Sequence, residues 1–427
     1  MRKAETFILG GGVTGLAAGL SSGLTVLEAR DDPGGICSSY YIRPGEKRRL
    51  SRPPRGGEVY RFEIGGGHWI FGGDPATLGL LRRLTPFKKY TRRSSVFFAK
   101  SKRYVPYPIQ HHLGHLGEKT ARIALLEIEK KIQTKSGTTL HRWLEDRFGP
   151  TLCRLFFHPF HERYTAGLWR HVAAQDDYKS PVHSSKKTGY NVTYLYPKEG
   201  LNALAGKMAE DCKIRYGRRV VNIDLKRREV CFEDGSSAGY GSLISTLPLN
   251  ELVKITGLSQ EREAPPYTSV LVLNIGAVRG AECPEDHWVY FADSDSGFHR
   301  VGFYSNVDRS FLPRSYRKSA DRVSLYAEKA YVGGRKPSQP ELERYTRLAV
   351  RELQQRGLIT ETEVVDPTWI EVAYTWNHPK TNWRSLWLAR LAGYGIHSIG
   401  RYGAWNFQGI ADSVRDGLKI GRRFKRL

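Results

Sequence analysis

The stretch FILGGGVTGLAAG, residues 7–19, decides the fold, because it places a glycine-rich turn directly after a short apolar run. The apolar residues suit a buried β-strand, and Gly10, Gly12 and Gly15 have the GxGxxG spacing of a dinucleotide-binding turn. Glycines without a Cβ let the backbone approach a pyrophosphate closely. The spacing therefore predicts a phosphate-binding turn between a strand and a helix.

The residues that follow extend this pattern to a complete strand–helix–strand unit. Residues 16–22 suit a short helix, whose N-terminus would point free N–H groups at an anion. A second strand over residues 25–29 contains Glu28, whose carboxylate can accept hydrogen bonds from the ribose hydroxyls of an adenosine. We therefore expect a Rossmann-like domain that binds a dinucleotide.

The basic start, Met1–Lys3, raises a second interpretation, because a basic start before an apolar stretch also opens secretory signal peptides. A signal peptide needs a cleavage site and a mature domain that stands alone, whereas here the glycine turn, helix and acidic strand continue without a break. We expect residues 7–15 to remain in the mature protein.

The next segment, RDDPGG at residues 30–35, favours FAD over NAD as the dinucleotide. Gly34 and Gly35 form a second glycine pair after an acid and a short turn, which is the extended pyrophosphate-binding pattern of flavoproteins. The alternative is an ordinary Pro-Gly turn.

The charge of the chain is high, with 67 Lys and Arg against 43 Asp and Glu, or +24 in 427 residues. Such a balance favours an anionic partner, such as a nucleotide, a phospholipid surface or a nucleic acid, without naming one. No RNA-binding motif or amphipathic anchor supports a specific nucleic-acid or peripheral membrane contact. We expect most basic residues to form a solvated surface and the substrate to be a small anion; the oligomeric state stays open.

Cysteine usage and hydropathy narrow the class further. Five scattered cysteines, with no C-x-x-C pair and no Cys/His cluster at metal spacing, predict a reducing, cytoplasmic environment and no metal site. The sequence contains no run of about 18 apolar residues, so we expect no membrane-spanning helix.

The coarse pattern predicts an α/β protein with a Rossmann-like FAD domain, a substrate domain with a mixed or antiparallel sheet, and an inserted helical region. The segments are a first FAD-binding part (1–76), the mainly helical substrate insertion (77–195), a second FAD-binding part (196–260), the substrate-domain sheet (261–390) and a closing FAD-binding segment (391–427).

Within this plan, several elements can be placed from apolar periodicity and turn residues. The predicted helices cover residues 113–144, 151–160 and 409–421; the predicted strands cover 59–64, a hairpin at 219–223 and 229–235, a buried strand at 242–248, and second-sheet strands at 270–277, 287–291 and 324–331.

Taken together, these segments resemble the FAD-dependent superfamily that contains UDP-galactopyranose mutase, protoporphyrinogen oxidase and the amine oxidases. The landmarks are the GxGxxG turn with Glu28, LISTLP at residues 243–248, and GRYGAW at residues 400–405. Three further motifs resemble the mutase branch: GGHWIF (66–71), YVPYPIQ (104–110) and YTAGLW (164–169).

The resemblance implies a reaction without net redox change. In the mutases, N5 of the reduced flavin attacks the anomeric carbon of a nucleotide-diphosphate sugar, the diphosphate leaves, and the sugar recloses as a furanose. It also implies residue roles. His68 lies beside the flavin, Arg401 and Lys179 hold the diphosphate, Tyr164, Thr165, Trp169 and Phe407 contact the substrate, Gly67, Gly400 and Gly409 contact the flavin, and Val220 contacts the adenine.

Departures from the mutase pattern put UDP-galactose itself in doubt. Lys179 stands where the mutases have a second arginine, Phe407 stands in place of a tyrosine, and Gly409 in place of an acid. Lysine keeps the charge but loses the bidentate fork of arginine. These changes favour the alternative of a flavin oxidoreductase of the amine oxidase or protoporphyrinogen oxidase type, in which substrate hydride passes to N5. A non-catalytic basic module that uses FAD structurally is a third, weaker alternative.

Overall fold

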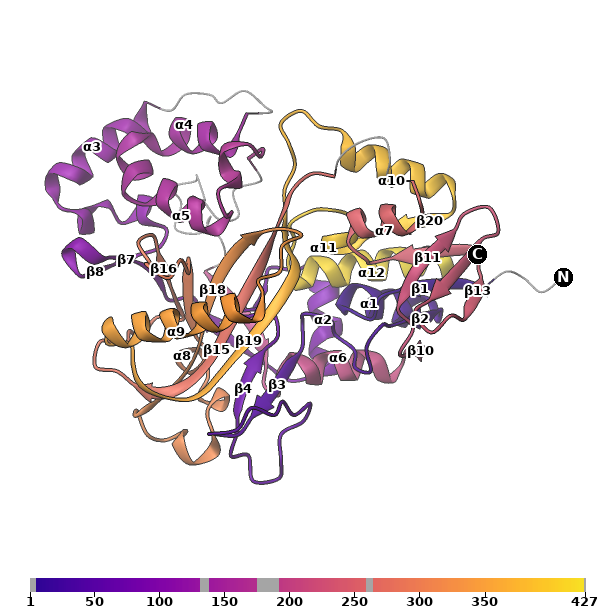
Figure 1. Cartoon of the computed structure of the whole chain (residues 1–427), viewed down its shortest axis with the longest axis horizontal. Coiled ribbons are helices and arrows are strands. Elements are labelled where there is room, and N and C mark those ends of the chain that lie inside the picture. The colour runs from indigo at the N-terminus through magenta and orange to yellow at the C-terminus, as the bar shows by residue number, and fades with distance from the viewer. Residues whose placement is uncertain (1–4, 131–137, 175–191, 259–263, 426–427) are drawn as a thin grey trace.

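The computed structural model describes residues 5–130, 138–174, 192–258 and 264–425. A parallel sheet and its helices form one side of the molecule, a large mixed sheet forms the other, and a group of helices sits above the mixed sheet (Figure 1). The predicted α/β fold with a Rossmann-like domain and a mixed second sheet is confirmed.

The parallel sheet has five strands in the order β10-β2-β1-β14-β20, which puts the quoted stretch at its centre. Phe7 pairs with Thr25 on one side and with Leu243 on the other. The strands are β1 (Thr6–Leu9), β2 (Thr25–Leu27), β10 (Ile214–Arg215), β14 (Ser242–Ser245) and β20 (Ile396–Ser398).

Both faces of this sheet are buried. Successive side chains of a strand point to opposite faces, so alternate residues of β1 lie in different apolar clusters. Ile8 packs with Val26 and Ile244 on one face, whereas Phe7 and Leu9 belong to a separate apolar cluster on the other. Continuous apolar strands of this kind are typical of a parallel sheet covered by helices on both faces.

Helix α1 (Val13–Ser22) and the C-terminal helix α12 (Ile410–Lys425) pack closely on each other, which confirms the predicted closing helix. Their backbones approach at Gly417, where an added Cβ would collide with the carbonyl oxygen of Thr14 and stand 2.7 Å from the Cβ of Ala17. The other helices around this sheet are α2 (Pro75–Leu84), α6 (Leu201–Glu210), α7 (Leu249–Ile255), α10 (Trp383–Gly393) and α11 (Gly400–Gly403).

The predicted hairpin is also confirmed, and a third strand extends it. Strands β11 (Val220–Asp224), β12 (Glu229–Phe232) and β13 (Ser237–Gly239) form an antiparallel sheet. Two further small sheets contain β3 (Ser39–Ile42) with β4 (Tyr60–Glu63), and β5 (Ile70–Phe71) with β9 (Thr193–Pro197) and β6 (Phe87–Thr91).

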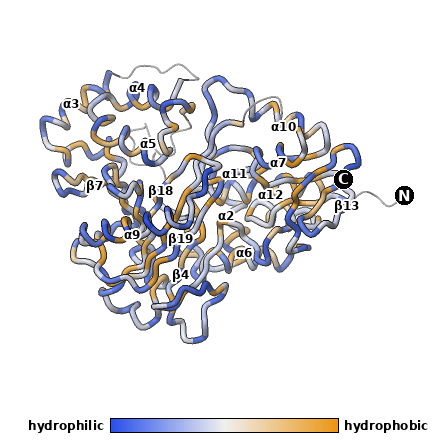
Figure 2. Tube along the Cα trace, viewed as in Figure 1, coloured by the Kyte–Doolittle hydropathy of each residue, from blue (hydrophilic) through white to orange (hydrophobic). Residues whose placement is uncertain are grey.

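The mixed sheet contains the three predicted second-sheet segments in the order β19-β15-β18-β17-β16-β7-β8. Along β15, Leu271, Leu273 and Ile275 pack in the cluster that includes α9, whereas Val270 and Val272 belong to the central core. The elements are β7 (Ser94–Phe98), β8 (Arg103–Pro106), β15 (Tyr267–Arg279), β16 (Trp288–Phe291), β17 (Arg300–Phe303), α8 (Tyr304–Val307), β18 (Arg322–Val332), α9 (Gln339–Gln355) and β19 (Ile359–Thr375). Figure 2 shows apolar residues along these inner strands and hydrophilic residues on the outer loops.

The expectation that the insertion at residues 77–195 is mainly helical was wrong for its first third, where β6, β7 and β8 lie. β7 pairs in parallel with β16, whose residues lie about two hundred positions later in the chain. Such long-range pairing leaves no trace in local periodicity, so the run looked like part of an insertion.

A single helix over residues 113–144 was also wrong. A 3₁₀ turn ends at Gly117, whose φ of +87° interrupts the helical path, and α3 (Glu118–Glu129) begins after it. Thr139 is extended and caps a separate helix, α4 (Leu140–Leu152), which kinks at Gly149. A π-helical turn over Cys153–Phe157 then leads into α5 (His158–Tyr164).

The contact between α1 and α12 predicts opposite effects for one substitution at two helical glycines. Gly417→Ala should lower the free energy of unfolding by about 1–3 kcal/mol, because the new methyl group overpacks the contact. At Gly206 on α6 an added Cβ meets no atom within 4 Å, so Gly206→Ala should be stabilising by about 0.5–1 kcal/mol. Urea unfolding measures both, and equal effects would contradict this packing.

Candidate functional site

The glycine turn after β1 forms one end of the site. Gly10 has a φ of +99°, and a Cβ there would collide with the hydroxyl of Thr246. Gly12 is the N-cap of α1 and supplies no capping side chain, so the first N–H groups of the helix are directed at the space before it. Gly15 packs inside, where a Cβ would collide with the carbonyl oxygen of Gly10. The three glycines thus serve different steric needs of one turn.

Glu28 and the second glycine pair hold this turn in place. The Gly11 N–H donates to Oε2 of Glu28 at 2.6 Å, and the Arg30 N–H donates to Oε1 at 2.9 Å. The Gly34 N–H donates to the Gly11 carbonyl at 2.8 Å, and Gly34 and Gly35 both have positive φ. The glycine turn, the end of the second strand and the second glycine pair, which the sequence assigned together to FAD binding, therefore contact one another.

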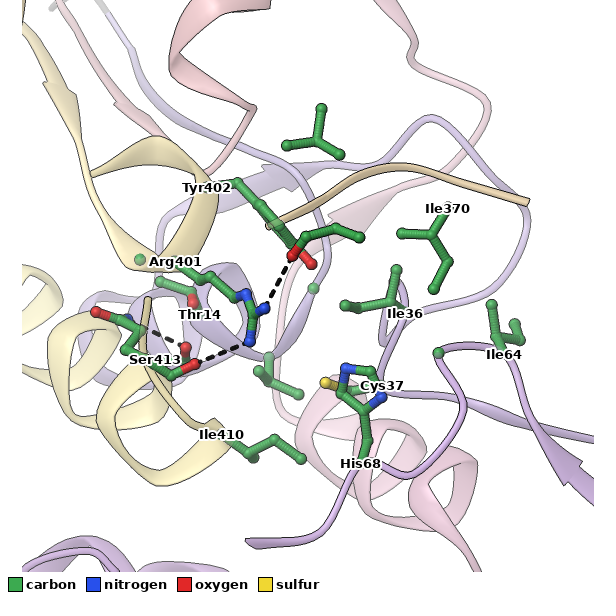
Figure 3. Close-up of a pocket in the computed structure, with 18 of the residues that line it drawn as sticks. Thr14, Ile36, Cys37, Ile64, His68, Ile370, Arg401, Tyr402, Ile410 and Ser413 are labelled. Carbon is green, nitrogen blue, oxygen red and sulfur yellow. Dashed lines mark hydrogen bonds between the residues drawn. The ribbon is translucent and has the colours of Figure 1, made fainter. Parts of the chain in front are cut away.

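One cavity of about 500 Å³ extends from this turn to the mixed sheet (Figure 3). Four separate parts of the chain bring predicted residues to its wall. The predicted residues that line it are Gly10, Gly12, Gly34, Gly35, Gly67, His68, Gly400, Arg401, Phe407 and Gly409.

His68 and Arg401 face the same part of the cavity (Figure 3). Arg401 donates to the carbonyl oxygens of Ala373 at 2.8 Å and Gln408 at 3.3 Å, and its guanidinium lies 4.4 Å from the ring centre of Phe407. Burial lowers the pKa of His68 to about 4, and the positive charge of Arg401 adds to this effect. His68 is therefore a neutral imidazole at pH 7.

A buried ion pair in the cavity wall escaped the sequence argument. Arg300 on β17 binds Glu328 on β18 through both carboxylate oxygens, at 2.8 and 2.6 Å, and both side chains are buried. Burial alone would raise the pKa of Glu328, but Arg300 and His299 hold it below its usual range. A charged residue within each of two apolar strand sequences, Arg300 in HRVGF (299–303) and Glu328 in SLYAEKAYV (324–332), is the signal that could have marked this site.

The YTAGLW motif lies one layer behind the cavity wall. The ring of Tyr164 packs edge-on against Tyr374, a lining residue, with centroids 4.8 Å apart. Thr165 donates to the His161 carbonyl at 2.7 Å and accepts from the Trp169 N–H at 3.0 Å. Trp169 points into the helical region, so these substrate assignments stay predictions.

Two other predicted residues lie off the cavity wall or outside the described chain. Val220 begins β11, and the nearby Arg218 N–H donates to the Glu28 carbonyl at 2.8 Å, which anchors the hairpin beside the second strand. The contact of Val220 with adenine stays a prediction. Lys179 lies outside the described residues.

The residues present fit an FAD molecule. A Cβ on Gly12 would meet no atom within 4 Å, so this glycine leaves open space beside the uncapped N-terminus of α1, where a pyrophosphate binds well. The cavity then continues past Gly35 to His68 and the mixed sheet. Gly10, Gly12, Gly34 and Gly35 would hold the pyrophosphate, and Gly67, Gly400 and Gly409 the flavin.

The fold and the site define a dinucleotide-binding flavoenzyme with a second, substrate-side sheet. The chain belongs to the flavin containing amine oxidoreductase family, whose model matches residues 16–379. An enzymatic role and FAD as cofactor, both expected from the sequence, are thereby confirmed.

Solved structures share the whole fold at low sequence identity. A reduced UDP-galactopyranose mutase superposes with a TM-score of 0.81 at 20% identity, covering 99% of this chain and 93% of the mutase. Putrescine oxidase bound to putrescine gives 0.62 at 16% identity, covering 99% of each chain. A fatty acid isomerase from P. acnes that produces CLA gives 0.61 at 14% identity, again covering 99% of each chain.

Among the described helices, none has both the length and the apolar character needed to cross a membrane.

The open space at Gly12 predicts a selective loss of cofactor. Gly12→Ala has an allowed backbone conformation, so the FAD-free protein should unfold like the wild type. The methyl group would occupy the phosphate approach at a cost of about 1–3 kcal/mol, which corresponds to a roughly 5- to 150-fold higher Kd for FAD. Fluorescence titration with FAD measures it, with Gly206→Ala as the control; unchanged affinity would contradict the assignment.

The environment of His68 predicts a pH-dependent stability. Between the unfolded pKa of 6.5 and the folded value of about 4, only the unfolded chain takes up the proton, so stability falls as the pH drops through this window. At pH 5, protonation of this histidine in the unfolded chain lowers the free energy of unfolding by about 2 kcal/mol. Between pH 7 and pH 5, His68→Asn should therefore lose less unfolding free energy than the wild type, whereas the exposed control His378→Asn should match it. An identical slope in His68→Asn would contradict the pKa.

Proposed function

We propose that this flavoenzyme binds a nucleotide-diphosphate sugar and isomerises it between its pyranose and furanose forms. The observation that carries the proposal is the cation Arg401, which lines the same cavity as the neutral His68 and as Arg300, whose charge is paired with Glu328. An anionic diphosphate is attracted to such a place, whereas an alkylammonium substrate is repelled.

The charged groups around His68 act on its pKa in opposite directions. After burial, the largest influence on it is Arg401, which lowers the pKa; Glu328 raises it by less, and Arg300 lowers it again. At the imidazole, the two arginines together outweigh the one carboxylate. The Arg401 charge therefore favours a substrate group that carries or develops negative charge near it.

The chain's own residues fit distinct tasks in such a reaction. Reduced FAD, when bound, supplies the nucleophile. Arg401 is held by two backbone carbonyls, so its guanidinium is preorganised to stabilise negative charge on a departing diphosphate. Neutral His68 can donate or accept one hydrogen bond without adding charge. Stacked Phe407 and Tyr374 offer an apolar wall to a sugar or base.

The fold comparison supports the mutase-like reaction over the alternative. The superposition on the mutase is closer than on putrescine oxidase, with TM-scores of 0.81 and 0.62. The absence of a tyrosine hydroxyl at Phe407 and the glycine at position 409 leave the nucleotide and the sugar open, so the proposal names the diphosphate-sugar class and not UDP-galactose.

A second candidate function is oxidation of a substrate by hydride transfer to FAD. The aromatic side chains of Trp369, Tyr374 and Phe407 in the cavity wall favour it, because flavin oxidases often enclose an apolar substrate. In this case substrate alone would bleach the oxidised flavin under anaerobic conditions.

The test is to trap the sugar on the flavin. The FAD-loaded protein is reduced with dithionite without oxygen, mixed with UDP- and dTDP-sugars and cyanoborohydride, and analysed by mass spectrometry. We expect a flavin–sugar adduct with at least one sugar, and about a hundredfold slower formation in Arg401→Met, because one preorganised cation is lost. The matched control is Arg422→Met, which removes an exposed arginine on α12.

The opposite result is also defined. If no sugar forms an adduct with the reduced protein while an amine or another substrate bleaches oxidised FAD, the oxidoreductase function replaces the mutase-like one.

A further inference from the structure

Three metal-ligating side chains meet in the helical region, away from the flavin cavity. His141 and Glu145 lie one turn apart on α4, and His158 is the first residue of α5. Nε2 of His141 lies 3.7 Å from Oε1 of Glu145, and Nε2 of His158 lies 3.9 Å from the same oxygen. The three ligand atoms all lie within 4.8 Å of one another.

We propose that His141, Glu145 and His158 form a binding site for a divalent transition-metal ion of the Zn²⁺ type, with a water molecule as fourth ligand. Two imidazoles and one carboxylate are a common ligand set for tetrahedral Zn²⁺. With bonds of 2.0–2.1 Å, ligand atoms around a tetrahedral ion stand about 3.3 Å apart. The two separations from Glu145, 3.7 and 3.9 Å, and the third, at most 4.8 Å between the imidazoles, therefore have to shorten by about 0.4 to 1.5 Å through rotamer changes to close on an ion.

The unsatisfied bonding of His158 supports this site. Its Nε2 is shielded from solvent and has no hydrogen-bond partner among the described residues. A buried ring nitrogen without a partner is costly, and a bound cation would satisfy it. The side chains of His141 and Glu145 are 39% and 35% exposed, so an ion and its water can enter from solvent.

The neighbouring side chains shape the site without blocking it. The indole of Trp169 packs on both imidazoles, with ring centroids 4.9 Å from His141 and 4.8 Å from His158. The indole N–H of Trp169 donates to Glu162 at 2.8 Å. Glu162 also forms an ion pair with Arg170 at 3.0 Å, so the positive charge of Arg170 near the site is compensated. The indole thus forms a fixed wall behind the two histidines.

Metal binding would tie two helices together. α4 kinks at Gly149 and is followed by the π-helical turn at Cys153–Phe157, so the ion would join the first two turns of α4 to the start of α5. Because Trp169 contacts both histidines, an ion at this place would change its environment. The site is independent of the reaction proposed for the flavin cavity.

The test uses the full-length, FAD-loaded protein after removal of metals with EDTA. Titration with CoCl₂ should give the visible absorption of tetrahedral Co²⁺ at one equivalent, and Zn²⁺ should displace it, whereas Mg²⁺ should not. His158→Ala and Glu145→Gln should weaken Co²⁺ binding by at least about tenfold. The control His378→Ala, at an exposed histidine, should bind like the wild type. Retained FAD absorbance shows that each variant is folded.

A second readout separates this site from other histidines on the surface. Co²⁺ should quench part of the tryptophan fluorescence in the wild type, and Trp169→Phe should lose this quenching while it keeps the Co²⁺ absorption. If the wild type gives no tetrahedral Co²⁺ spectrum, or if His158→Ala and Glu145→Gln bind Co²⁺ as tightly as the wild type, the proposal is wrong.

Discussion

The hydrogen bonds that hold the glycine turn after β1 are the constraint on which the rest of the structure depends. Glu28 accepts the Gly11 N–H at 2.6 Å, and Gly34 donates to the Gly11 carbonyl at 2.8 Å, so three chain segments are fixed to one turn. The turn directs the N-terminus of α1 at the cavity, and α1 in turn packs on α12 at Gly417. The position of the dinucleotide site, of the parallel sheet and of the closing helix α12 thus depends on the geometry of this one turn.

From this turn the cavity leads to a second set of constraints, which are electrostatic. Arg300 and Glu328 are buried together and bind in bidentate fashion, so neither charge is left uncompensated in the wall. Arg401 comes from α11 on the opposite domain and is held by the carbonyl oxygens of Ala373 and Gln408. The parallel sheet therefore supplies the cofactor end, and the meeting of the two sheets supplies the charged end that can select a substrate.

The sequence predicted the parts of this arrangement that depend on local pattern. Strand–glycine–helix spacing located Gly10, Gly12 and Gly34, and apolar runs located β14 and β15, because each rests on neighbouring residues. The strand β7 was missed because its partner β16 lies far along the chain, and β8 joins the sheet only through β7. The Arg300–Glu328 pair was missed because its two residues meet only through the tertiary fold. His141 and Glu145 are one turn apart on α4, but His158 joins them only through the packing of α5 on α4.

The central claim is that the charged end of the cavity recognises a diphosphate. Calorimetric titration of UDP into the reduced, FAD-loaded protein tests it most directly, since it needs no turnover and no knowledge of the sugar. The account predicts binding of one UDP per chain, weakened by added salt and by loss of the Arg401 charge. No heat of binding with UDP, together with bleaching of oxidised FAD by a diamine such as putrescine, would contradict it.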